Sequence, residues 1–208
     1  MADTKGERTR ERIISTAAPV FNRLGYAGAT MADLMAATGL EKGGLYRHFE
    51  SKDEIALASF DHAVRLHGDR IRSYIAAAGP TAPARLVAVA EAIASVVENP
   101  VLVGGCPLLN TAIESDDAEG SLYPALRTRT RRAMTRLITA VRDIISDGVT
   151  RGEFRKGLDA DAEASGIVAM LEGALMLSKL YDDAAHVRYA VDRVRDRADA
   201  FAASRKSR

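Results

Sequence analysis

Apolar residues recur at spacings of three and four along almost the whole 208-residue chain, a period that matches an α-helix and not a β-strand. The periodic stretches are rich in alanine and are separated by glycine, proline and asparagine, which interrupt helices. Hydrophobic residues make up 47% of the chain, enough for a sizeable core. We therefore predict an all-α protein.

Local signals place the helix ends. Thr30 with Asp33, and Ser51 with Glu54, have the spacing of capping boxes, and Gly39 is a natural C-terminal stop. The predicted helices cover about residues 7–24, 30–38, 42–49, 51–78, 83–98, 106–115, 121–151, 159–181 and 184–203. The first three form a small head, so we predict a DNA-binding domain at 1–50 and a helical body at 51–208 for effector binding and dimerisation.

Composition excludes several classes of protein. The net charge is +1, so no global positive charge points to nucleic acid. Cys106 is the only cysteine, which excludes an internal disulfide and a multi-cysteine zinc site and suits a reducing cytoplasm. The N-terminal residues are charged, without the apolar core of a signal peptide, and we find no uncharged apolar run of about 18 residues. We expect a soluble, cytoplasmic protein that needs no membrane, metal or cofactor.

The histidines do not form a catalytic or metal-binding pattern. His48, His62, His67 and His186 are scattered, and no Ser/His/Asp order or phosphate-binding loop is present. We do not expect an enzyme.

The segment GLEKGGLYRHFESKDEI, residues 39–55, indicates a helix-turn-helix. Two short helices meet at Gly39 and Leu40, and the second would enter a DNA major groove with its N-terminal end, Lys42-Gly43-Gly44. Because Gly43 and Gly44 have no side chains, the backbone there could approach bases or phosphates closely. The apolar core beneath is expected to comprise Leu34, Leu45 and Phe49.

Polar groups for DNA contact cluster in this segment. Tyr46, Arg47 and His48 follow within one turn, and Arg47 could bind guanine O6 and N7 with both arms of its guanidinium. Lys52 and Thr30 each begin a helix, where the helix dipole favours a phosphate. The alternative is a solvated turn between core helices.

The run TMADLMAATGLEKGGLYRHFESKDEI, residues 30–55, closely resembles the DNA-binding head of the tetracycline-repressor (TetR/AcrR) family of bacterial transcriptional regulators. The resemblance covers about residues 8–55, and the body resembles the family only in architecture. It implies a homodimer that reads a palindromic operator in double-stranded DNA. It also implies repression, relieved when a small-molecule effector binds in the body.

The resemblance assigns roles to individual residues. It places Thr30, Tyr46, His48 and Lys52 on phosphates, Lys42, Gly43 and Arg47 at or near the bases, and Gly44 at a close packing contact. Two positions depart from the family pattern. Glu41 replaces a frequent serine and would repel phosphate if it faced DNA, and Pro19 is expected to kink the first helix.

The body suggests a dimer interface and, more weakly, a ligand site. Residues 167–180 are apolar and rich in small residues, and the last helix carries a valine stripe; the family implies that both pair with their copies, while the alternative is that they close the monomer's core. The predicted interface residues are Gly166, Met170, Gly173, Leu177, Val187, Val191, Val194 and Ala198. The predicted ligand residues are Cys106, Asn110, Ile113, Glu114, Leu137 and Met170.

Other interpretations remain open at the level of sequence. Asn110 could cap backbone in a loop packed on the core and not face a ligand. Cys106, at a predicted helix start, could sense electrophiles or oxidants, although a lone cysteine is usually a small core residue. A helical interaction protein that no longer binds DNA is the remaining alternative.

Overall fold

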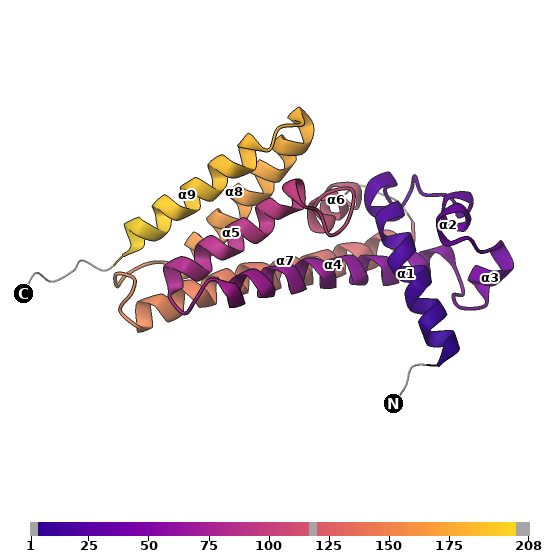
Figure 1. The fold of residues 1–208 in the computed structure, drawn as a ribbon, viewed down its shortest axis with the longest axis horizontal. Helices are drawn as coiled ribbons and strands as arrows, with labels where there is room; N and C mark the ends of the chain where they lie inside the picture. The colour runs from indigo at the N-terminus through magenta and orange to yellow at the C-terminus, as the bar shows by residue number, and fades with distance from the viewer. Residues whose placement is uncertain (1–3, 117–119, 203–208) are drawn as a thin grey trace, which may run out of the picture. The chain divides into compact units, whose positions relative to one another are not determined.

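The computed structural model describes residues 4–116 and 120–202. Their secondary structure is helical, and among them the only strand-like pairing is an isolated bridge between Phe154 and Ala202. Figure 1 shows the helices in chain order. They are α1 (Lys5–Leu24), α2 (Met31–Thr38), α3 (Lys42–Tyr46), α4 (Lys52–Ala77), α5 (Ala82–Glu98), α6 (Pro107–Glu114), α7 (Leu122–Thr150), α8 (Ala160–Tyr181) and α9 (Ala185–Phe201).

The all-α prediction is confirmed, and most helix ends fall within about two residues of their predicted positions. The main difference is α3, which ends at Tyr46 and not near residue 49; the chain then tightens into a turn, in which the His48 N–H donates to the Leu45 carbonyl three residues back (3.0 Å). Helix α1 begins earlier than predicted, since Thr4 and Glu7 form a capping box. It continues through Pro19. The last residue of the predicted ninth helix, at position 203, lies outside the described residues.

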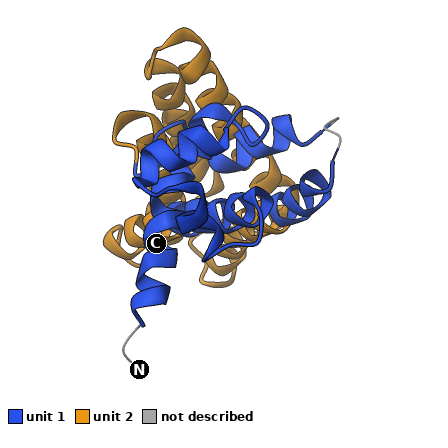
Figure 2. Ribbon diagram, turned by 90° about the vertical axis from the view of Figure 1, so that its right-hand side faces the viewer, with its two compact units in different colours: residues 1–67, 101–131 blue, residues 68–100, 132–208 orange. Residues whose placement is uncertain are grey.

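The chain divides into two compact units, shown in blue and orange in Figure 2. The first unit comprises residues 1–67 and 101–131, and the second comprises residues 68–100 and 132–208. The predicted boundary at residue 50 therefore lies inside the first unit, where α6 and the start of α7 join the first three helices. A functional division at residue 50 stays a prediction.

The core of the first unit largely follows the predicted apolar pattern. Leu34, Leu45 and Phe49 are all buried, as expected for the interior of a helix-turn-helix. On α1, Ile13, Ala17 and Phe21 are buried, whereas Leu24, at the end of the helix, is 40% exposed. The Arg10 guanidinium lies 4.5 Å from the centre of the Phe49 ring and covers the core from outside.

The core of the second unit corrects the prediction for the last helix. Helix α9 packs against both α5 and α8, and its valine stripe faces these helices. The side chains of the stripe are almost completely inaccessible to solvent within one chain. They therefore close the core of the monomer, which was the alternative to a dimer interface. The residues predicted for the dimer interface but buried in the monomer's core are Val187, Val191, Val194 and Ala198.

Helix α8 is apolar on two faces. By length and composition it could cross a membrane, although 44% of its most apolar window is buried in the structure. Val168, Leu171 and Leu175 face the core, whereas Met176 and Leu180 are 45% and 70% exposed. The burial of one side of α8 identifies it as a core helix with a second apolar face.

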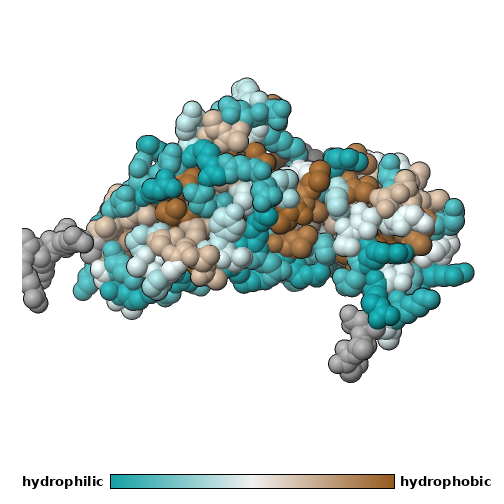
Figure 3. Space-filling model, in the orientation of Figure 1, coloured by the Kyte–Doolittle hydropathy of each residue, from teal (hydrophilic) through white to brown (hydrophobic). Residues whose placement is uncertain are grey.

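The face of the molecule in Figure 3 is mostly hydrophilic, with separate brown apolar patches.

We expect Val194→Ala to lower the free energy of unfolding by about 2 kcal/mol, because Val194 is fully buried and the substitution removes apolar contacts. Urea denaturation at a fixed protein concentration measures this. Lys156→Ala, at an exposed position, is the control and should change the value by less than about 0.5 kcal/mol. A Val194→Ala variant as stable as the wild type would contradict the burial of the stripe.

Candidate nucleic-acid interface

Helix α2 is fixed by a complete capping box. The Thr30 hydroxyl accepts a hydrogen bond from the Asp33 N–H (3.2 Å), and the Asp33 carboxylate accepts from the Thr30 N–H (2.8 Å) and from the Thr30 hydroxyl (2.6 Å). These hydrogen bonds hold the pKa of the Asp33 carboxyl below its usual value. The predicted capping box is confirmed. The phosphate contact predicted for Thr30 stays a prediction and requires the hydroxyl to exchange Asp33 for the phosphate.

The turn between α2 and α3 has the geometry predicted from the sequence. Gly39 ends α2 in the left-handed conformation (φ 68°), and its N–H donates to the Met35 carbonyl. Glu41 then begins α3, but its side chain makes no capping hydrogen bond. The carboxylate of Glu41 is exposed, at the end of α3 that is predicted to approach DNA.

The side chains of α3 divide into an exposed and a packed set. Lys42, Tyr46 and Arg47 are exposed, and the Lys42 ammonium lies 5.9 Å from the centre of the Tyr46 ring. Gly43 is exposed too, and a Cβ built on it would meet nothing within 4 Å. The outer surface of α3 is therefore bare backbone flanked by two cations and a phenol, a set suited to phosphates and base edges.

Gly44 and His48 lie deeper. A Cβ on Gly44 would lie 3.5 Å from the Leu40 side chain, so Gly44 packs against the turn. His48 is half-buried beside the buried Phe49. The structure thus brings all the predicted α3 residues into one short segment, with Gly43 outward and Gly44 inward.

Lys52 begins α4 beside this surface but has a partner that the sequence did not predict. Its ammonium donates to the Tyr26 carbonyl at 3.0 Å, in the turn between α1 and α2. The Ser51 hydroxyl caps the helix by accepting from the Glu54 N–H (3.1 Å). In a complete capping box the Glu54 carboxylate would accept from the Ser51 N–H. Here it accepts from the Glu50 N–H instead, at 2.7 Å. That bond, opposed by partial burial and assisted by Arg10, lowers the pKa of the Glu54 carboxyl.

Helix α6 and the loop before it support the turn between α1 and α2. The Glu114 carboxylate accepts from the Ala27 N–H at 2.8 Å, and Asn22 donates to the carbonyls of Val103 (2.9 Å) and Gly105 (3.0 Å). The ring of Tyr26 stacks on an aromatic neighbour in α1. Sequence reasoning missed these contacts; a large aromatic residue in a glycine-rich turn was the only local signal.

Four of the six predicted ligand residues, Cys106, Asn110, Ile113 and Glu114, lie in the first unit. Asn110 donates to the carbonyls of Asn22 (3.2 Å) and Gly104 (2.9 Å), which is the backbone-capping alternative. Glu114 supports the turn, as described above, and Ile113 is 64% exposed. Cys106 is buried at the N-terminus of α6. The polar groups of Asn110 and Glu114 hold other parts of the first unit, so nothing in the structure supports their ligand role, which stays a prediction.

The remaining two predicted ligand residues lie in the second unit. Leu137 is half-buried on α7, and Met170 on α8 lines a pocket of about 450 Å³ between α8 and α9. The other five predicted ligand residues do not line this pocket. They do not line the second, larger groove of this unit either.

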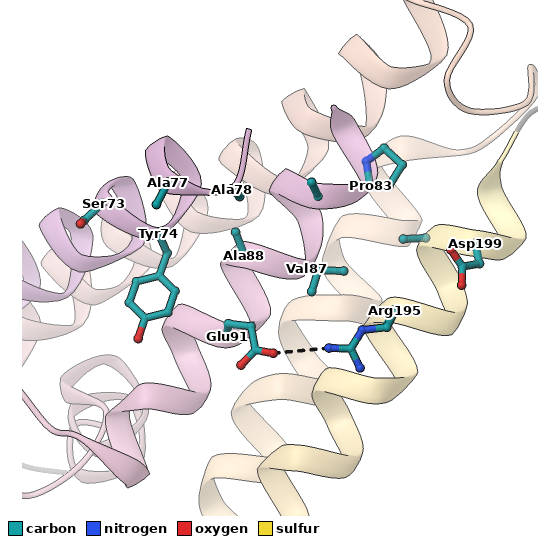
Figure 4. A pocket seen from close by; sticks show the side chains of 12 residues that line it. Ser73, Tyr74, Ala77, Ala78, Pro83, Val87, Ala88, Glu91, Arg195 and Asp199 are labelled. Atoms are coloured by element: carbon teal, nitrogen blue, oxygen red, sulfur yellow. Dashed lines mark hydrogen bonds and ion pairs between the residues drawn. The ribbon is translucent and has the colours of Figure 1, made fainter. Parts of the chain in front are cut away.

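That larger groove has a volume of about 700 Å³ and lies between α4, α5 and α9 (Figure 4). Its walls are mainly alanine, valine and proline, and the Tyr74 side chain and the Glu91 carboxylate extend toward the same end. Arg195 pairs with Glu91 at 3.5 Å. The lining residues are Ser73, Tyr74, Ala77, Ala78, Pro83, Ala84, Val87, Ala88, Glu91, Arg195, Ala198 and Asp199. An apolar groove of this size with a few polar groups suits a small organic molecule.

The other four predicted interface residues lie on α8 and face outward. A Cβ built on Gly166 or Gly173 would meet nothing within 4 Å, and Met170 and Leu177 are half-buried. With the exposed Leu180 they follow a spacing of three and four residues, which places them on one helix face. Among the residues that the structure describes, no group of His, Cys, Asp and Glu is arranged to hold a metal ion.

Comparison with protein families and solved structures gives a consistent result. The family "Bacterial regulatory proteins, tetR family" matches residues 13–59, and "Tetracyclin repressor-like, C-terminal domain" matches residues 82–194. A crystal structure of a TetR transcriptional regulator from Chloroflexus aurantiacus is 42% identical, with a TM-score of 0.89, covering 95% of this chain and 98% of that one. A TetR-family regulator from Cytophaga hutchinsonii is 32% identical, with a TM-score of 0.86, covering 97% and 98%.

A relative that is named as a repressor is less similar in sequence than these two structures. The HTH-type transcriptional repressor DhaR of Mycobacterium sp. (strain GP1) is 25% identical over 171 residues, which cover 82% of each chain.

Proposed function

The chain belongs to the TetR family of bacterial regulatory proteins, and on this premise we propose that it is a homodimeric repressor that leaves a palindromic operator when a small molecule binds its second unit. As a member of that family it is a DNA-binding transcriptional regulator, and members of the family are regulators and not enzymes. A repressor is favoured over an activator because a relative of similar length is named a transcriptional repressor. Its proposed location is the cytoplasm, where it meets DNA.

The observation that carries the proposal is the exposed surface of α3. Lys42, Gly43 and Tyr46 on this helix, and Arg47 directly after it, present two cations, a hydroxyl and bare backbone; the helix follows α2, whose start is held by a capping box. Such a short helix, held by its neighbours, suits insertion into a major groove. In the proposed complex, Arg47 reads a base and Lys52 binds a phosphate.

A dimer is proposed because one helix-turn-helix reads only half of a palindromic site. The proposed interface is the outer face of α8, where glycines with open space at Cβ alternate with apolar side chains. Small residues allow a partner helix to approach closely, and burial of Met176 and Leu180 would remove exposed apolar surface from water. The valine stripe of α9 supports this face from inside.

The proposed effector site is the 700 Å³ groove between α4, α5 and α9. Its walls offer apolar surface, and the ion pair between Glu91 and Arg195 could orient a ligand. Cys106 is a weaker candidate for sensing, since its thiol is buried.

Selection of duplexes from a random pool by the purified protein should enrich a palindrome, because two copies of α3 would read equivalent half-sites. Lys52→Ala should then weaken binding to all duplexes alike and reduce the slope of log K against log salt by about 0.9, whereas Arg47→Ala should relax preference at one position of each half-site. A folded protein that enriches no sequence would contradict sequence-specific regulation. An unchanged salt slope in Lys52→Ala would contradict the phosphate contact.

Gly173→Arg should convert the dimer into folded monomers, because the new side chain would project from the outer face of α8 into the partner. Light scattering measures the mass, and circular dichroism confirms that the helices persist. Ala140→Arg, on an exposed position of α7, is the matched control and should stay dimeric. A dimeric Gly173→Arg variant would place the interface elsewhere.

Val87→Trp should fill the groove and weaken binding of Nile red, a neutral apolar dye, by about tenfold or more. Ala140→Trp adds the same side chain outside the groove and should bind the dye as the wild type does. Equal dye affinity in both variants would show that the groove does not take apolar ligands. Fluorescence titration gives both affinities.

A further inference from the structure

One peptide group connects α6 to the lysine that is proposed to bind phosphate. The N–H of the Tyr26–Ala27 peptide donates to the Glu114 carboxylate at 2.8 Å, and its carbonyl accepts from the Lys52 ammonium at 3.0 Å. Both hydrogen bonds involve a charged group, which makes them stronger than bonds between neutral groups. Because the two bonds share one amide, each polarises the amide in the sense that strengthens the other.

The turn that holds this peptide has little room to move. Gly25 has φ 78°, and a Cβ there would lie 3.0 Å from a carboxylate oxygen of Glu114. The Tyr26 ring is buried and stacks on Phe21, with ring centres 5.4 Å apart. Burial raises the pKa of the Tyr26 phenol, so its hydroxyl keeps its proton, 3.5 Å from the Thr111 hydroxyl of α6.

The Glu114 carboxylate is held in turn by its surroundings. The Tyr123 hydroxyl of α7 lies 3.5 Å from its Oε1, and burial together with this carboxylate raises the pKa of the Tyr123 phenol. Arg127 donates to the Ser115 carbonyl at 3.0 Å, directly after the end of α6. Helix α6 therefore presents the carboxylate from a fixed position within the first unit.

We propose that Glu114 is a positioning residue for DNA binding: through the Tyr26–Ala27 peptide it holds the Lys52 ammonium where a DNA phosphate can meet it. The Tyr26 carbonyl takes one of the three ammonium hydrogens, which leaves two for phosphate oxygens. A lysine fixed in this way loses less conformational freedom when DNA binds than a solvated lysine does. This inference rests on the proposed function, because it requires Lys52 to contact DNA.

A double-mutant cycle on operator binding tests the proposal. The probe is the duplex enriched from the random pool, and Kd is measured at several salt concentrations for Glu114→Ala, Lys52→Ala and the double variant. Glu114→Ala should raise Kd about tenfold and reduce the salt slope by about 0.9, as loss of one phosphate contact would. In the Lys52→Ala background the same substitution should change Kd less than twofold. Effects that multiply, with an unchanged slope in Glu114→Ala, would overturn the proposal.

Two further variants separate positioning from charge and from folding. Asp116→Asn removes one negative charge from an exposed position two residues away and should leave Kd within twofold of the wild type. Glu114→Gln keeps a carbonyl that can accept from the Ala27 N–H, and it should retain most of the affinity. If Glu114→Gln and Asp116→Asn weakened binding as much as Glu114→Ala, the loss would not depend on the hydrogen bond to the Ala27 N–H, and the proposal would fail.

Hydrogen exchange examines the contact without DNA. The Ala27 amide should exchange at least tenfold faster in Glu114→Ala than in the wild type, while amides in the middle of α1 stay protected. Faster exchange with unchanged DNA affinity would establish the hydrogen bond and overturn its positioning role. A wild-type protein that binds no duplex would instead refute the proposed function itself, and the positioning role with it.

Discussion

The turn between α1 and α2 is the constraint on which the first unit depends. It is only a few residues long, yet it meets α1 through the Tyr26 ring, α4 through the Lys52 ammonium and α6 through the Glu114 carboxylate. Gly25 makes the turn possible, since its φ of 78° and its close approach to Glu114 both disfavour a side chain. Helices α2 and α3 follow directly from this turn, so its position sets where their exposed residues lie.

In the second unit, the corresponding constraint is the burial of α8 and α9 against α5. The valine stripe of α9 and one face of α8 are both buried in the core of a single chain. A helix that is apolar on two faces must have the second face covered to remove it from water. This is why the outer face of α8, and not the valine stripe, is the surface proposed for a partner chain.

The prediction of helices succeeded where the cause was local. Thr30 with Asp33 and Gly39 placed the ends of α2 because a cap and a left-handed stop depend on residues a few positions apart. The same reasoning extended α3 too far, since no local signal in residues 47–49 indicates that the chain turns there. It also did not find the hydrogen-bond partners of Asn110 and Glu114, because these partners, Asn22 and Ala27, are more than 80 residues away in the sequence.

The helical class, the approximate ends of most helices and the start of α3 could be predicted from the sequence alone, because periodicity, caps and a compact motif depend on residues close together in the chain. Which apolar face is buried was decided only by the tertiary structure. A stripe such as Val187–Val191–Val194 fits a core and a dimer interface equally well until the neighbouring helices are in place. The hydrogen bond between Glu114 and the Ala27 N–H could likewise be found only in the tertiary structure. A hydrogen bond between distant segments depends on how the helices pack and not on the spacing of residues along the chain.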